Sequence, residues 1–142
     1  MLDKLKKKIE NNQIIQVSFF ENNDVDELLD MRDEMEFDSE WMRVYNFLNE
    51  MSIRECEKNK INDIREKTFL MAYTLSNSSD IASCVSDDLE IICKAYILEY
   101  NDDWLNSLIM SYARGEFPCG KLKKTEWTIK ECVHNLLSEF NR

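Results

Sequence analysis

Carboxylates are the most abundant side chains in this sequence that could carry out chemistry. Of the 142 residues, 28 are acidic, and pairs at helical spacing occur within Glu27–Asp30, Asp63–Glu66 and Asp87–Glu90. Such pairs on facing helices could hold Mg²⁺ through oxygen ligands. In so acidic a chain the spacing also arises by chance, and no glycine or lysine cluster for binding phosphate accompanies it. A magnesium-dependent hydrolase is therefore an alternative rather than the main hypothesis.

Nucleophilic catalysis and transition-metal binding have little support. The only histidine is His134, so a histidine-based metal site is not expected, and we predict a structural position for it. Cys132 stands two residues away and points elsewhere on a helix, which disfavours a Cys–His dyad. The five cysteines are widely spaced without a Cys-x-x-Cys motif, as is typical of free thiols in a cytoplasmic protein. We predict no cofactor, no bound metal and no enzymatic activity.

Most of the acidity is concentrated in one segment. The formal net charge of the chain is −10, and Glu21–Glu40 alone holds ten acidic residues and a single basic one, Arg32. Like charges four residues apart on a helix cost about 0.2–0.5 kcal/mol per pair, so the segment gives up some stability. Two explanations stay open: a solvated face, or a docking surface that attracts a basic partner. Nucleic acid is not an expected partner, because binding phosphates requires Lys and Arg.

A second acidic group has a simpler explanation. It comprises Asp87, Asp88, Glu90, Asp102 and Asp103. Aspartate near a helix N-terminus is favoured by the helix dipole, so we expect these residues mainly to cap helices.

The elements that must position these residues are helices. The chain has only two glycines and one proline, whereas all-β folds need a turn about every 8–12 residues. Apolar residues recur at positions i, i+3, i+4 and i+7 almost throughout. We predict an all-α fold of seven or eight helices packed as antiparallel hairpins, in a single domain spanning residues 1–142. No apolar run is long enough for a signal peptide or a membrane span.

The acidic segment is predicted to form an amphipathic helix. Asn23 or Asp24 is expected to cap it, and an apolar stripe running from Val25 through Leu28 to Met35 is expected to face the core. Spacings of three and four place the acids on the opposite face. The predicted partner-binding residues are Asp26, Glu27, Asp30, Asp33, Glu34 and Asp38.

Three further expectations concern the helix boundaries. Residues 13–20 are rich in β-branched and aromatic side chains, which allows either a short strand or a helical turn. The polar cluster at residues 76–80 favours a loop, followed by a short helix and then a new helix opened by residues 87–88. The last helix is expected from about Thr125 to Phe140.

A small helical chain with free cysteines, an acidic Glu21–Glu40 segment and no catalytic cluster resembles the immunity proteins of bacterial toxin systems, such as those of contact-dependent growth inhibition. The resemblance is one of type rather than motif and assigns no role to an individual residue. It implies a tight 1:1 complex with a cognate toxin domain, often a basic nuclease whose phosphate-binding surface the acids would cover. The alternatives are a helical adaptor with an apolar groove and a Mg-dependent all-α pyrophosphohydrolase.

Overall fold

The computed structural model describes residues 1–21 and 23–138, and within them it contains eight α-helices and no strand. The helices are α1 (Leu2–Glu10), α2 (Ser18–Glu21), α3 (Val25–Asp33), α4 (Met35–Asn49), α5 (Glu55–Ser76), α6 (Ser79–Leu98), α7 (Asp103–Ala113) and α8 (Ile129–Leu137). The predicted all-α fold of seven or eight helices is confirmed. No helix in this part of the chain is long and apolar enough to cross a membrane.

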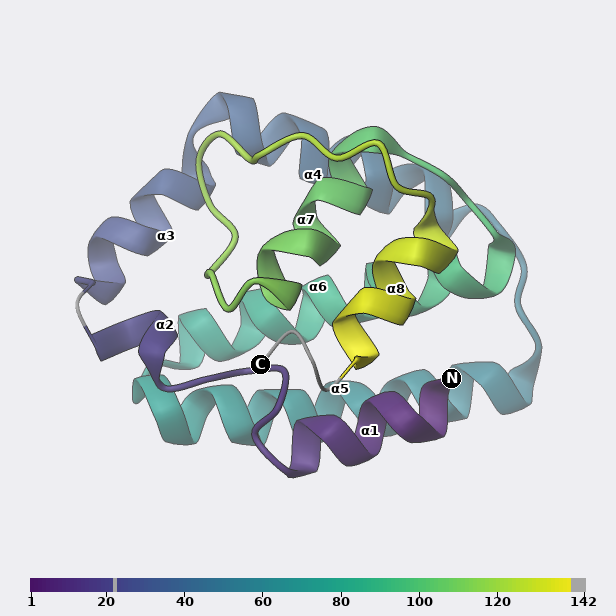
Figure 1. The fold of residues 1–142 in the computed structure, drawn as a ribbon, viewed down its shortest axis with the longest axis horizontal. Helices are drawn as coiled ribbons and strands as arrows, with labels where there is room; N and C mark the ends of the chain where they lie inside the picture. The colour runs from purple at the N-terminus through teal and green to yellow at the C-terminus, as the bar shows by residue number, and fades with distance from the viewer. Residues whose placement is uncertain (22, 139–142) are drawn as a thin grey trace.

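The two longest helices, α5 and α6, form an antiparallel hairpin (Figure 1). Asn77 ends α5 in the left-handed conformation (φ 57°), and the Ser78 side chain accepts a hydrogen bond from the Ile81 amide to start α6. Helix α1 lies along α5, α8 packs on α7, and α3 and α4 follow one another along the opposite side of the molecule from α1. The predicted hairpin packing is therefore present.

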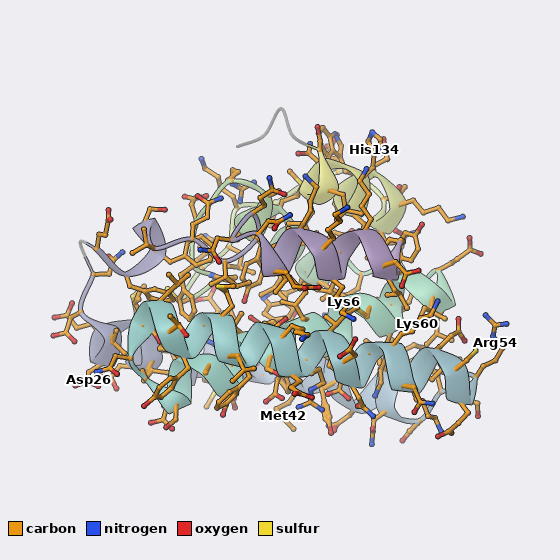
Figure 2. The ribbon with its side chains drawn as sticks, turned by 90° about the horizontal axis from the view of Figure 1, so that it is seen from below. Lys6, Asp26, Met42, Arg54, Lys60 and His134 are labelled. Atoms are coloured by element: carbon orange, nitrogen blue, oxygen red, sulfur yellow. The ribbon has the colours of Figure 1, made fainter. Side chains whose placement is uncertain are left out.

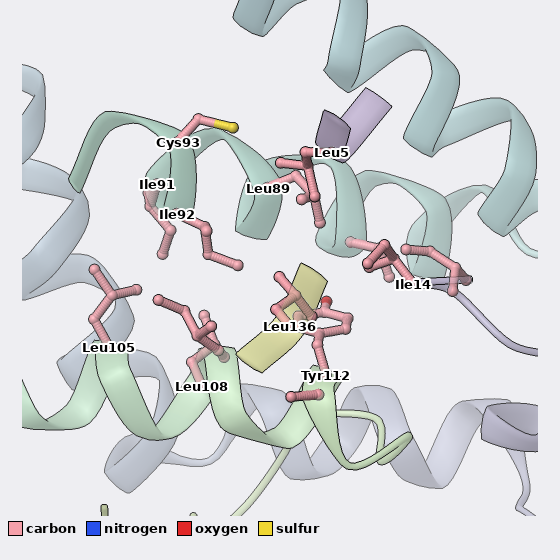
Figure 3. Packing of buried hydrophobic residues seen from close by; sticks show 14 of the residues in the cluster. Leu5, Ile14, Leu89, Ile91, Ile92, Cys93, Leu105, Leu108, Tyr112 and Leu136 are labelled. Carbon is pink, nitrogen blue, oxygen red and sulfur yellow. The ribbon is translucent and has the colours of Figure 1, made fainter. Parts of the chain in front are cut away.

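The core lies where α6, α7 and α8 meet. Every residue of Leu105–Ala113 in α7 is buried, and Figure 3 shows Ile92 of α6, Leu108 of α7 and Leu136 of α8 in the same apolar cluster. Leu5 of α1 reaches this cluster from the other end of the chain. The described residues thus share one core. That the domain spans residues 1–142 stays a prediction, because residues 139–142, Phe140 among them, lie outside the described part.

Two predicted helix boundaries are wrong. Helix α6 runs without interruption from Ser79 to Leu98, so Asp87 and Asp88 lie in its middle rather than at a helix start. The final helix begins after Thr128, which forms a capping box with Glu131, rather than at Thr125. In both cases the local preference of Asp and Thr for helix starts gave several candidate boundaries, and tertiary contacts selected among them.

Residues 13–20 contain a helical turn and no strand. Residues 13–17 are irregular and bury Ile14 and Ile15, and α2 follows directly. The helical alternative is therefore confirmed. The five cysteines are free, as predicted.

Candidate partner-binding surface

The acidic segment forms two helices rather than one. Helix α3 begins after Asp24, whose carboxylate accepts a hydrogen bond from the Asp26 amide, as predicted. It ends at Asp33, because Glu34 has an extended backbone (φ −63°, ψ 143°) and α4 starts at the next residue. Residues on the two sides of this break do not share a helix face, so spacing counted across it is misleading. The prediction that Met35 faces the core is wrong. Its side chain is 83% exposed.

All six predicted partner-binding residues are exposed. Four lie on the side of α3 opposite buried Leu28, one lies in the break, and one lies in the first turns of α4. We call this set the acidic surface: Asp26, Glu27, Asp30, Asp33, Glu34 and Asp38. Within residues 1–21 and 23–138, none of their side chains forms a salt bridge.

Acidic side chains elsewhere are mostly paired with cations. Asp63 of α5 contacts Lys6 of α1 at 2.5 Å, and Asp87 of α6 contacts Arg65 of α5 at 2.6 Å. Among the described residues of Glu21–Glu40 that lie on the surface, only Glu40 has such a partner, Arg43. Exposed carboxylates without a described salt bridge also occur elsewhere, at Glu10 and Glu66 for example, so what distinguishes the acidic surface is that six of them lie within a short stretch of the chain.

Arg32, the one basic residue of the segment, points into the core instead of balancing this charge. Its guanidinium donates two hydrogen bonds of 2.8 Å to the Asp88 carboxylate and one of 3.2 Å to the carbonyl oxygen of Pro118. The rings of Phe37 and Phe117 lie 4.6 and 5.5 Å from the guanidinium carbon, within cation–π range. Arg32 is 7% exposed and Asp88 is fully buried.

Asp88 accepts two more hydrogen bonds, 2.8 Å from the Trp41 indole nitrogen and 2.7 Å from the Tyr112 hydroxyl. Each carboxylate oxygen therefore has two donors, so the buried charge is both paired and fully hydrogen-bonded. Burial lowers the pKa of Arg32, but the charge and hydrogen bonds of Asp88 outweigh that and hold it above its usual range. This buried network joins α3, α4, α6 and α7.

The prediction that Asp88 caps a helix is wrong. Asp88 stands three residues after Val85 and four before Ile92, so it lies on the apolar face of α6, and this spacing is the sequence signal for its burial. Capping does hold for Asp102, which accepts a hydrogen bond from the Leu105 amide at 2.9 Å at the start of α7.

Tyr112 is expected to make the folded protein less stable at alkaline pH. Burial, and after it the charge of Asp88, raises the pKa of Tyr112 well above its ordinary value of 10.0. The folded protein therefore keeps a proton that the unfolded chain releases above about pH 10, so the free energy of unfolding falls as pH rises through that value. We expect urea midpoints to fall between about pH 9 and about pH 11.5, and to fall less steeply in Tyr112→Phe.

The same variant has a cost at neutral pH. Removing the hydroxyl takes one donor from buried Asp88, which we expect to lower the free energy of unfolding by about 1–3 kcal/mol. Cys93, whose pKa burial raises to about 12, adds alkaline sensitivity to both proteins, so only their difference reports on Tyr112. Identical alkaline slopes in the two proteins would contradict the assignment.

The carboxylate pairs considered for magnesium do not converge. Asp63 faces Lys6, while Asp87 and Glu90 both face Arg65. No group of three or more His, Cys, Asp or Glu side chains placed to hold a metal ion occurs among the described residues. His134 is exposed on α8.

The adaptor alternative needs an apolar groove. The roomiest cavity described, about 710 Å³, lies between α4, α7 and the segment before α8. Trp104 and Leu122 contribute apolar surface to it, but most of its lining side chains are charged or polar, including Glu36, Glu40 and Lys121. A cavity with so polar a lining does not favour the binding of an amphipathic peptide.

Comparison with known families places this all-α chain in the class of immunity proteins, whose members bind and neutralise a cognate toxin. It belongs to the family described as Immunity protein PIM1, whose model matches residues 4–119. The matched region contains the acidic surface and the whole network around Arg32 and Asp88, and it ends before α8. The resemblance to bacterial toxin immunity proteins is thereby confirmed. A search of curated proteins found no match.

Proposed function

We propose that this protein neutralises its cognate toxin domain by binding it in a 1:1 complex through the acidic surface. One observation carries the proposal: the six carboxylates are exposed and form no described salt bridge, while Arg32, the one basic residue of Glu21–Glu40, is turned inward to Asp88. Membership of an immunity protein family supplies the expectation of a toxin. The protein contributes a binding surface rather than a catalytic group.

The toxin surface that fits this arrangement is basic. A nuclease must carry Lys and Arg where it holds nucleic-acid phosphates, and a row of carboxylates can occupy the same positions. We therefore propose a nuclease domain as the target and the cytoplasm as the place where the complex forms. By its resemblance to contact-dependent growth inhibition systems, the toxin is expected to be the C-terminal domain of a large secreted protein encoded directly upstream.

Charge of this kind acts mainly on the rate of association. Complementary surfaces raise association rate constants to about 10⁸–10⁹ M⁻¹s⁻¹ at low salt, against about 10⁵–10⁶ M⁻¹s⁻¹ without steering. Added salt screens the attraction. For an immunity protein, rapid capture limits the time during which a free toxin can act.

The double variant Asp30→Lys/Glu34→Lys tests the proposal. We expect its association with the purified, catalytically inactivated toxin domain to slow by at least about tenfold at low salt, with the difference shrinking as salt rises. Neither side chain has a described intramolecular partner, so urea unfolding is expected to be unchanged or slightly improved. Stopped-flow association and urea denaturation measure the two effects.

A matched control changes the net charge equally at a different place. Glu10→Lys/Glu66→Lys alters exposed side chains on α1 and α5 that form no described salt bridge. Association of this control is expected to stay near that of the wild-type protein. Equal slowing in both double variants would show that the total charge governs association, and would refute the proposal that the acidic surface is the binding site.

A further inference from the structure

Exposed methionines gather in one part of the molecule. Four of the seven methionines are exposed, and all four fall between residues 31 and 51: Met31, Met35, Met42 and Met51. The other three are partly or fully buried. A single exposed apolar side chain is ordinary on a protein surface, but a concentration of them along α4 and its two ends is not accounted for by core packing.

Met35 and Met42 stand on the outer side of α4. They are seven residues apart, which is about two helical turns, so they lie on the same side of the helix. The inner side is fixed by the buried residues Phe37, Val44 and Leu48. The exposed fractions are 83% for Met35 and 41% for Met42. We call Met35 and Met42 the methionine ridge.

Carboxylates of the acidic surface lie beside this ridge. Asp33 and Asp38 line a cleft of about 170 Å³ together with Met42, and Trp41 and Arg32 also contribute to its lining. Figure 2 shows Asp26 and Met42 along one edge of the molecule, with His134 at the opposite edge. Two carboxylates of the acidic surface, Asp33 and Asp38, therefore border the ridge at Met42, and a third, Glu34, is the chain neighbour of Met35.

We propose that the methionine ridge is the apolar centre of the toxin interface and that the acidic surface is its rim. This inference rests on the proposed function and adds the residues that hold the complex together. The occupant is a basic protein surface with an apolar depression among its Lys and Arg side chains, because only such a surface complements both the ridge and the unpaired carboxylates around it.

Methionine is suited to this position. Its side chain is unbranched and polarizable, so it adapts to an irregular partner surface. Interface centres are enriched in Met and depleted of charge, whereas their rims are polar, and most of the binding energy comes from a few central side chains. The acidic surface is then expected to govern how fast the complex forms, and the methionine ridge how slowly it separates.

The test is the double variant Met35→Ala/Met42→Ala, measured by surface plasmon resonance against the purified, catalytically inactivated toxin domain encoded upstream. We expect the dissociation rate constant to rise by at least about tenfold, equally at about 50 mM and about 500 mM salt, with the association rate unchanged. Alanine is the strongest helix former and both positions are on the outer side of α4, so the fold is retained, as circular dichroism can verify.

Leu70→Ala provides the matched control, because Leu70 is 56% exposed on α5. Its dissociation rate is expected to equal that of the wild-type protein. An unchanged dissociation rate in Met35→Ala/Met42→Ala, or an equal rise in Leu70→Ala, would overturn the proposal that the methionine ridge is the centre of the interface. If Asp30→Lys/Glu34→Lys slows association in the same assay, the acidic surface stands on its own and only the ridge has failed. If neither double variant affects binding, both proposals fail.

Discussion

Replacing Asp88 with alanine is expected to lower the free energy of unfolding by about 3–5 kcal/mol. The variant leaves the Arg32 guanidinium buried without a counter-charge and removes the acceptor for the Trp41 indole and the Tyr112 hydroxyl. Typical domains are stable by about 5–15 kcal/mol, so this one change can remove a large part of the total. Urea denaturation followed by circular dichroism and tryptophan fluorescence measures the loss.

The double variant Arg32→Met/Asp88→Leu separates the cost of an orphaned charge from the value of the ion pair. Replacing both partners of a buried pair by apolar side chains is often neutral or stabilising, whereas removing one is costly. We therefore expect the double variant to be more stable than Asp88→Ala. Recovery is incomplete, because Tyr112 and Trp41 still lack their acceptor. Wild-type stability in Asp88→Ala would contradict the network's role.

The network also bears on the proposed interface. Arg32 belongs to α3, which carries most of the acidic surface, and Trp41 belongs to α4, which carries the methionine ridge. Both side chains are held by Asp88 in the middle of α6. The two helices are thereby fixed relative to each other before the toxin arrives. A surface ordered in advance loses less conformational entropy on binding, which strengthens the complex without any added contact.

Local sequence patterns were sufficient for the fold class and for part of the acidic surface. Scarce glycine and proline, together with apolar periodicity, predict helices because backbone freedom and amphipathic burial are short-range properties. The caps at Asp24 and Asp102 were predictable for the same reason, since each carboxylate bonds an amide two or three residues ahead. The exposure of the acids on α3 follows from the position of Leu28 on its inner face.

The remaining features depend on distant partners. The spacing of Asp88 from Val85 and Ile92 indicates the apolar face of α6, but its partners Arg32 and Trp41 lie far away in sequence and could not be predicted from it. The break at Glu34 could not be seen either, because neither glycine nor proline marks it. That break turns Met35 from a predicted core residue into the most exposed large apolar side chain of the described chain. The methionine ridge was therefore beyond a prediction based on spacing alone.

The orientation of α4 can be tested by comparing two residues that are almost adjacent. Phe37→Ala is expected to cost about 3–5 kcal/mol, because a buried aromatic ring is lost and leaves a cavity. Phe37 is 1% exposed, packs edge-to-face on Trp104 with ring centroids 5.2 Å apart, and covers the Arg32 guanidinium. Phe37→Leu keeps most of the apolar volume and is expected to cost less. Urea denaturation measures each change as a shift of the midpoint, provided that the slope of unfolding free energy against urea concentration stays the same.

Met35→Ala is the matched control, two residues earlier on the same helix. Its side chain is mostly in solvent, so we expect the free energy of unfolding to change by no more than about 0.5 kcal/mol. The two variants together separate the roles of the two sides of α4: Phe37 contributes to folding, and Met35 is left available for binding. Similar losses of stability in both would mean that α4 does not present Met35 to solvent, and the methionine ridge would lose its structural basis.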